Sequence, residues 1–358
     1  MSLTLAVYLH NISPFAVRFP DLPYLPAGIR WYGLSYLLGF LLAYLIIRHV
    51  TRVGRSTVKP GEVGDMIVTM AFGVVLGGRL GYVFFYDPSL LGWIDRPPYW
   101  GVLAMNQGGM ASHGGMIGAI VGAWWYARRG RRPELAQVRA QERARPLRHS
   151  LAHVLDLAAF ATPIGLGFGR IANFINGELY GRPCPADFPL AVKFPQEIYT
   201  WDLSKLLSLA DQVGYQRVLD NDGSARRFMA LVIDKVRAGD PRYRQAVAAM
   251  LPARYPSQLF EAVLEGLVLS GVLMIVWRKP RKPLVLSGWF CLGYGILRIV
   301  GEFFRMPDAQ IMNQEFAHWH ITRGQWLSAV LSLAGVVMIA LAARRHVEPM
   351  GGWRATKS

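Results

Sequence analysis

Residues 162–181 contain the side chains best suited to chemistry. The stretch is apolar and rich in glycine, and its far end carries polar residues, namely Arg170, Asn173, Asn176 and Glu178. At about 100° per residue, Arg170, Asn173 and Gly177 fall in one narrow arc of a helix, with Glu178 beside it. A cation, an amide and a backbone without a side chain therefore face the same way.

An alternative is an ordinary helix end whose polar side chains reach toward a membrane surface. This would explain Arg170 alone, but not an arginine, two asparagines and a glutamate framed by glycines, where small residues let a backbone or ligand approach closely. No acidic residue lies on the arc of Arg170. We therefore expect its guanidinium group to be free to bind an anion.

The composition is that of a polytopic membrane protein. The chain has 358 residues, of which 53% are hydrophobic and 17% charged, and several apolar runs approach the ~20 residues that span a bilayer. The formal net charge is +16, but the basic residues are concentrated in short segments between apolar runs, which indicates membrane topology rather than a nucleic-acid partner. The two cysteines, Cys184 and Cys291, imply no disulfide framework.

We predict an all-α fold with about seven transmembrane helices. The expected spans are residues 28–48, 66–86, 110–128, 153–175, 259–277, 284–304 and 326–343. Basic residues follow the first, third, fifth and last spans, including the long run 128–148, so the C-terminus is expected in the cytoplasm and the N-terminus outside. The parts of the chain are then an N-terminal arm with four spans, a small periplasmic head, three spans and a cytoplasmic tail, at 1–175, 176–257, 258–345 and 346–358.

With this orientation, nearly all intramembrane polar residues lie at the outer ends of the spans. Besides the first cluster, these are Tyr32, Arg79, His113, Glu261, Tyr294, Arg298, Glu302 and Arg305. Structural polarity alone would be spread over both ends, so the pattern predicts one cavity near the outer leaflet. Arg298 and Glu302 are spaced i, i+4 and could instead form an ion pair that satisfies itself.

The third span contains Gly114, Gly118 and Gly122 at four-residue intervals. This spacing predicts a seam of small residues against which another helix packs closely. His113 lies at the start of the seam. A lone histidine usually packs, but at the wet end of a span it is also the side chain best suited to exchange protons near neutral pH.

Motifs in nearly every span resemble those of the phosphatidylglycerol–prolipoprotein diacylglyceryl transferase family. They comprise 31–34, 77–82, 112–115, 169–178, 255–261 and 298–308, with Ala172 and Tyr255 as departures from the usual residues. The resemblance implies a bacterial inner-membrane enzyme that moves a diacylglyceryl group from phosphatidylglycerol to the lipobox cysteine of a prolipoprotein, without metal or organic cofactor. Its functional positions correspond here to Tyr32, His113, Arg170, Asn173, Glu178, Gly181, Arg298 and Glu302.

The layout suits this chemistry. Arg170 and Arg298 could hold an anionic headgroup and stabilise its departing charge, and we add Arg79 as a substrate-binding candidate. His113 is the candidate base for the thiol, although a nearby arginine could instead lower the pKa of the thiol by its charge alone. The alternatives are a carrier or channel for an anionic lipid or solute, and a noncatalytic scaffold for secreted proteins.

Overall fold

The computed structural model describes residues 7–19, 28–95, 97–105, 109–129, 150–216, 222–306 and 321–354. Residues 130–149, which include most of the basic run 128–148 that was expected in the cytoplasm, lie outside this description. The chain forms two compact units. The first comprises Met1–Gly39, Pro163–Leu269 and Tyr294–Leu331, and the second comprises Phe40–Thr162, Ser270–Gly293 and Ser332–Ser358.

A helix occupies each of the seven expected ranges. They are α1 (Trp31–Val53), α2 (Val63–Phe85), α3 (Ser112–Arg129), α5 (Leu151–Asn176), the continuous run of α9 (Ser257–Glu261), η6 (Ala262–Val268) and α10 (Leu269–Val276), α11 (Val285–Glu302) and α12 (Arg323–Arg344). Among the described residues, five of these are long and apolar enough to cross a membrane: α1, α2, α5, the α9–α10 run and α12. The fold is thus that of a helical, multi-pass membrane protein.

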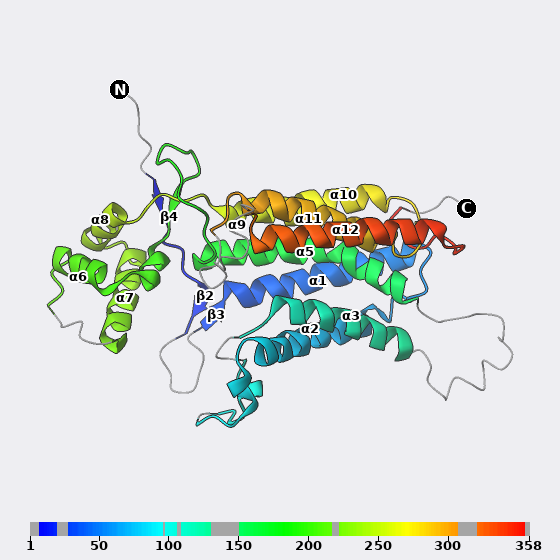
Figure 1. The fold of residues 1–358 in the computed structure, drawn as a ribbon, viewed down its shortest axis with the longest axis horizontal. Coiled ribbons are helices and arrows are strands. Elements are labelled where there is room, and N and C mark those ends of the chain that lie inside the picture. The colour runs from blue at the N-terminus through cyan, green and yellow to red at the C-terminus, as the bar shows by residue number, and fades with distance from the viewer. Residues whose placement is uncertain are drawn as a thin grey trace. The chain divides into compact units, whose positions relative to one another are not determined.

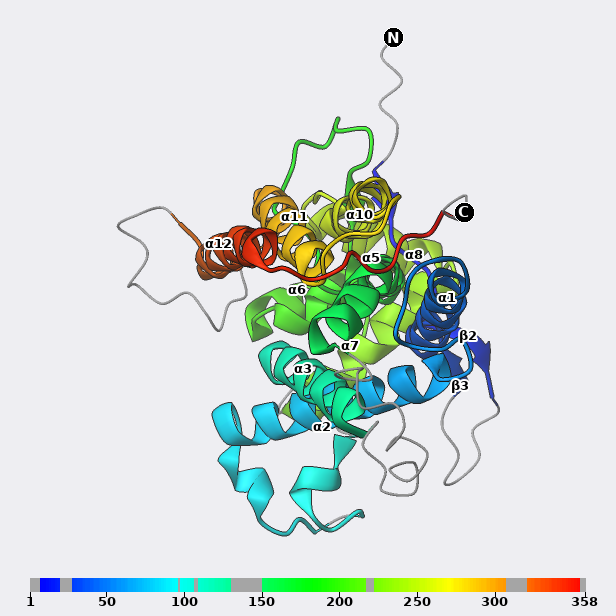
Figure 2. The same cartoon turned by 90° about the vertical axis from the view of Figure 1, so that its right-hand side faces the viewer.

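In the second unit, α2 and α3 lie side by side (Figures 1 and 2). Their closest approach runs along the predicted glycine seam, where Gly73 faces Gly118 and Gly77 faces Gly114. A methyl group added to Gly118 would overlap the backbone oxygen of Gly73. The close packing predicted from the four-residue glycine spacing is therefore confirmed.

In the same unit, a carboxylate on one helix caps the N-terminus of another. The carboxylate of Asp156 on α5 accepts hydrogen bonds from the backbone nitrogens of Leu284 and Ser287, both at 2.8 Å, and from the Ser287 hydroxyl. It therefore caps the N-terminus of α11, whose first amides would otherwise be unsatisfied.

The segment after α12 is held to the rest of this unit by hydrogen bonds. Met350 exchanges backbone hydrogen bonds with Arg281, and Gly351 does so with Arg55. The indole of Trp353 donates to the backbone oxygen of Met274 at 2.7 Å. The segment thus ties together the connections that follow α1 and α10, and we call residues 349–353 the C-terminal clasp.

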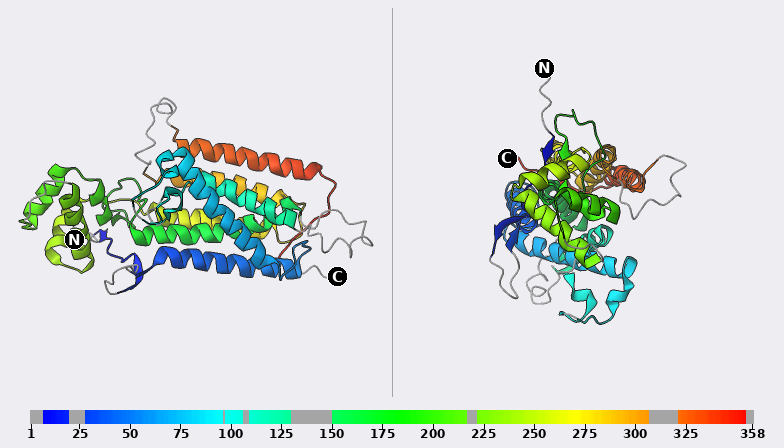
Figure 3. Two further views of the ribbon diagram at one scale, coloured as in Figure 1. Left: turned by 90° about the horizontal axis from the view of Figure 1, so that it is seen from below. Right: turned by 90° about the vertical axis from the view of Figure 1, so that its left-hand side faces the viewer.

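In the first unit, the head consists of α6 (Leu203–Gln212), α7 (Asp222–Arg237) and α8 (Pro241–Met250), which lie together in Figures 1 and 3. Its own apolar core includes Leu209, Phe228, Val232 and Val247, each fully buried. Leu9 joins this core from β1 (Tyr8–Leu9), which pairs in parallel with β4 (Val192–Lys193). A second small sheet pairs β2 (Phe15–Arg18) with β3 (Gly28–Arg30), so the helical fold carries only short strands in the part of the chain described.

Candidate active site

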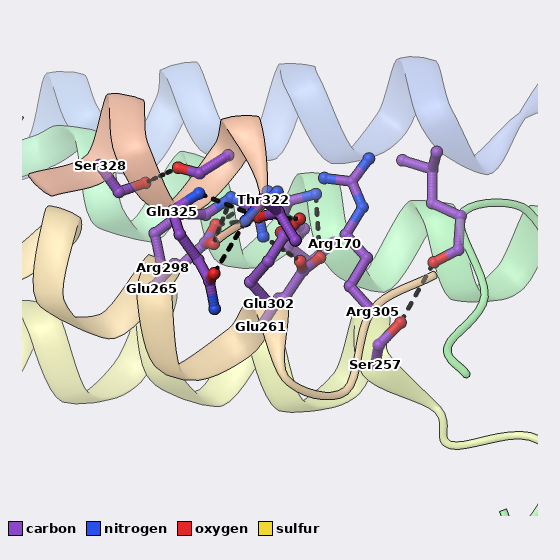
Figure 4. Close-up of polar contacts among 12 residues, drawn as sticks. Arg170, Ser257, Glu261, Glu265, Arg298, Glu302, Arg305, Thr322, Gln325 and Ser328 are labelled. Carbon is purple, nitrogen blue, oxygen red and sulfur yellow. Dashed lines mark hydrogen bonds and ion pairs between the residues drawn. The ribbon is translucent and has the colours of Figure 1, made fainter. Parts of the chain in front are cut away.

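Two arginines and two glutamates form the centre of the first unit's polar site (Figure 4). Glu261 places one carboxylate oxygen 3.0 Å from Nη1 of Arg170 and the other 2.6 Å from Nη1 of Arg298. Glu265 likewise lies 3.0 Å from Nη2 of Arg170 and 3.8 Å from Nε of Arg298. Each carboxylate therefore bridges both guanidinium groups, which holds the two cations close together despite their repulsion.

The local sequence explains how these groups meet. Glycines let α5 and η6 approach, because Gly167 and Gly266 face each other and a methyl group added to Gly266 would lie 2.8 Å from the Cα atom of Gly167. Arg170 follows Gly167 by about one helical turn, and Glu265 adjoins Gly266. The run 262–268 is a π-helix, a wider winding that is found frequently at functional sites.

Glu302 fixes Arg298 from a second side. Its Oε2 atom lies 3.2 Å from Nη2 of Arg298, so the ion pair that the i, i+4 spacing allows is present, but Arg298 also contacts Glu261 and Glu265 and the pair does not satisfy itself alone. The hydroxyl of Thr322, just before α12, donates to Oε1 of Glu302 at 3.2 Å. Gly324 allows this approach, because a methyl group there would lie 3.0 Å from the carboxylate.

The expectation that Arg170 has no carboxylate partner is wrong. Nε and both terminal nitrogens of Arg170 each lie within 3.1 Å of Glu261 or Glu265. These acids come from another helix, so inspection of the arc of Arg170 could not find them. The available signal was Glu265 itself, because a carboxylate inside an apolar span requires a partner.

A second cluster of polar side chains surrounds Asn173 at the end of α5. The side-chain amide of Asn173 donates hydrogen bonds to Oε1 of Glu178 at 2.8 Å and to the Tyr32 hydroxyl at 3.3 Å. The backbone oxygen of Glu178 accepts from the Gln258 side chain at 2.7 Å. Asn173 therefore contacts two other predicted substrate-binding residues, Tyr32 and Glu178, and Gln258 joins Glu178 to the helix that carries Glu261.

Gly181 lies where three backbone segments meet. Its nitrogen donates to the backbone oxygen of Tyr255 at 3.1 Å, and a side chain here would overlap the backbone oxygens of Tyr255 and Phe304. The oxygen of Gly181 accepts from Nη1 of Arg254 at 3.0 Å. Arg254 also forms a buried, two-pronged ion pair with Glu197, at 2.7 and 2.9 Å. The absence of a side chain at Gly181 therefore allows these backbone segments to pack closely.

Comparison with known proteins identifies the family. A family model described as prolipoprotein diacylglyceryl transferase matches residues 21–341. Curated proteins named phosphatidylglycerol–prolipoprotein diacylglyceryl transferase are similar over most of their length: one from Bdellovibrio bacteriovorus is 42% identical with 97% of both chains covered, and one from Rhodospirillum rubrum is 37% identical with 95% of this chain and 99% of the relative covered. The chain belongs to the prolipoprotein diacylglyceryl transferase family.

The second unit of the transferase contains the remaining predicted residues, Arg79 and His113. Arg79 is buried on α2, and its guanidinium donates to the backbone oxygens of Val102, Gly101 and Gly109. It thereby orders the connection that leads into α3. His113 is exposed in the first turn of α3.

Proposed function

We propose that this transferase moves the diacylglyceryl group of phosphatidylglycerol to the thiol of the lipobox cysteine in prolipoprotein signal peptides. The paired guanidinium groups of Arg170 and Arg298 carry this proposal. Two cations fixed within a membrane protein provide donors for one phosphate group, in surroundings where such hydrogen bonds are strong. Arg170 and Arg298 then bind the headgroup and stabilise its charge as it departs.

The reaction requires one new bond and one broken bond. The cysteine sulfur forms a bond to the carbon of the diacylglyceryl group that bears the phosphate. The bond between that carbon and the phosphate oxygen breaks, and glycerol phosphate leaves with the electron pair. The thiol proton must go to a base, for which we assign His113. The competing assignment is a thiol whose pKa is lowered by an arginine without a dedicated base.

The other predicted residues position the substrate and these groups. Glu302 orients Arg298 through their 3.2 Å contact. The cluster of Tyr32, Asn173 and Glu178 offers a phenol hydroxyl, an amide and a carboxylate, which are suited to the hydroxyl groups at the uncharged glycerol end of the headgroup. Arg79 is assigned an indirect role, because its guanidinium already binds backbone oxygens.

We further propose that the seven helices all cross the bacterial inner membrane, with the head in the periplasm and the C-terminus in the cytoplasm. The alternation of basic segments supports this orientation. A single cysteine replacing the exposed Arg226 on α7, in a background without Cys184 and Cys291, should react with an impermeant thiol reagent before the inner membrane is opened. Reaction only after opening would contradict it.

The function is tested with purified protein, phosphatidylglycerol and a lipobox peptide. We expect the peptide mass to rise by one diacylglyceryl group and glycerol phosphate to be released in equal amount. A peptide with serine in place of the lipobox cysteine is the matched control. An unchanged peptide together with lipid transport into protein-free vesicles would instead favour a carrier.

A further inference from the structure

Arg254 and Glu197 form a separate buried ion pair to which the reaction so far gives no part. Arg254 precedes α9 and is 6% exposed, and Glu197 lies in η5 (Pro195–Thr200) and is 7% exposed. Nε and Nη2 of Arg254 lie 2.7 and 2.9 Å from the two carboxylate oxygens of Glu197. Nη1 donates to the backbone oxygen of Gly181 at 3.0 Å. The Arg254 side chain thus connects η5 to the backbone that follows Glu178.

Both members of this pair are fixed by the head and its small sheet. Arg254 exchanges two backbone hydrogen bonds with Val192, at 2.9 and 3.0 Å. Val192 belongs to β4, which pairs with β1. Ile198, the neighbour of Glu197, is fully buried in the apolar core of the head. The guanidinium group is therefore held in place before it contacts Gly181, as a group that positions another must be.

The backbone that Arg254 contacts is the segment 177–182, which we call the Glu178 loop. Within it, Leu179 has a φ angle of 55°, a conformation that a residue other than glycine keeps only when its surroundings enforce it. The side chains of Ser257 and Gln258 donate to the backbone oxygens of Leu179 and Glu178, at 3.2 and 2.7 Å. The conformation of the Glu178 loop is thus imposed by side chains from the start of α9 and from Arg254.

The Glu178 loop meets the polar site through one carboxylate. Oε1 of Glu178 accepts hydrogen bonds from the side-chain amides of Asn173 at 2.8 Å and Asn176 at 3.3 Å. The two arginines proposed to bind the phosphate are held separately, because the carboxylates of Glu261 and Glu265 contact both of them. A displacement of the loop therefore moves Glu178 while the contacts between these carboxylates and the arginines remain.

We infer that Arg254 and Glu197 are positioning residues, which hold the Glu178 loop so that the Glu178 carboxylate meets the hydroxyl groups at the glycerol end of the lipid headgroup. This inference rests on the proposed function, because it takes phosphatidylglycerol as the substrate. Glu197 fixes the plane of the guanidinium group by its two-pronged contact, and the remaining terminal nitrogen then holds the backbone oxygen of Gly181.

Enzyme kinetics distinguish this role from a contribution to folding alone. The glycerol end is remote from the bond that breaks, so its contacts bind the ground state and the transition state alike. Loss of such contacts raises KM and leaves kcat nearly unchanged. A pair that only stabilised the fold would lower the melting temperature, and both kinetic constants of the folded protein would stay at their wild-type values.

The first test variant is the double substitution Glu197→Leu with Arg254→Met, which replaces the ion pair by apolar side chains that a protein interior tolerates. It removes the donor to Gly181 without leaving one buried charge unpaired. Transfer to a lipobox peptide is measured with the purified full-length protein at varied phosphatidylglycerol concentration in detergent micelles. We expect a KM for phosphatidylglycerol that is about tenfold higher, as for the loss of one hydrogen bond to substrate, and a kcat within about threefold of wild type.

Arg254→Lys is the second variant and keeps the positive charge beside Glu197. A single ammonium group cannot replace both the edge of the guanidinium that faces Glu197 and the nitrogen that faces Gly181, so KM should rise here as well. The matched control is Arg18→Gln with Asp234→Asn, which removes a 4.0 Å ion pair whose side chains are 61% and 60% exposed. This control should keep the wild-type KM.

A wild-type KM in either folded variant would overturn the inference and make the pair a stabilising element only. Failure of both variants to fold would overturn it in the same way, and a lower kcat at an unchanged KM would contradict the assignment to the glycerol end. Absence of diacylglyceryl transfer by the wild-type protein would instead contradict the proposed function.

Discussion

Oε2 of Glu265 lies 3.1 Å from Nε and 3.0 Å from Nη2 of Arg170. One carboxylate oxygen thus fixes an edge of the guanidinium plane, and Glu261 holds Nη1 from another direction. Because each terminal nitrogen carries two N–H groups, donors remain on Nη1 and Nη2 for a further oxygen ligand. Glu265 therefore orients the donors of Arg170 without using all of them.

His113→Gln should keep the fold and slow diacylglyceryl transfer by about 10²–10⁴-fold if His113 is the base. The fold should survive because His113 is exposed. The measurement is transfer to a lipobox peptide by purified protein, with the exposed His346→Gln as the matched control. Near-normal transfer by His113→Gln would favour activation of the thiol by arginine charge.

Gly118→Ala should destabilise the protein by roughly 1–3 kcal/mol, because the added methyl group overlaps the backbone of Gly73. Gly64→Ala on α2 is the matched control, since a methyl group there meets no atom within 4 Å. Thermal unfolding in detergent compares the two variants. Equal midpoints would mean that the α2–α3 seam tolerates a wider spacing.

Truncation after Glu348 removes the C-terminal clasp and should lower the melting temperature. The loss includes four backbone hydrogen bonds to Arg55 and Arg281 and the indole bond of Trp353, each contributing about 0.5–1.5 kcal/mol. Truncation after Arg354 keeps these bonds and should melt like the full chain. Equal melting temperatures of the two shortened proteins would mean that the C-terminal clasp adds no stability.

His10 should make the head less stable in acid. The ring is buried between Phe174 and Phe194, and burial lowers the pKa of His10 to about 4. The unfolded chain binds this proton near pH 6.5, so folding stability is fully present above that value and decreases as pH falls toward 4, by roughly 3 kcal/mol in total.

Unfolding of the head can be followed by hydrogen exchange at several pH values. His10→Phe fills the same apolar site without a titrating group, and its stability should be much less sensitive to pH between about 4 and 6.5. An acid response of the same size in His10→Phe would assign the effect to other groups.

Features set by local spacing could be predicted from the sequence. The Arg298–Glu302 pair and the Gly114–Gly118–Gly122 seam depend only on helical periodicity, and both are present. Glu265 was missed because its partner Arg170 is 95 residues away and the contact exists only after α5 and η6 pack. The contacts of Arg79 could not be predicted for a related reason, since backbone oxygens are acceptors that no sequence motif reveals.

The central claim is that Arg170 binds the lipid phosphate through the fixed geometry of its guanidinium group. The most direct measurement is phosphatidylglycerol binding and diacylglyceryl transfer by Arg170→Lys, with the exposed Arg52→Lys on α1 as the matched control. A lysine keeps the charge but cannot reproduce the two-pronged contact, so we expect Arg170→Lys to bind more weakly and to transfer about 10²-fold more slowly or worse. Binding and transfer at the wild-type level would contradict the account.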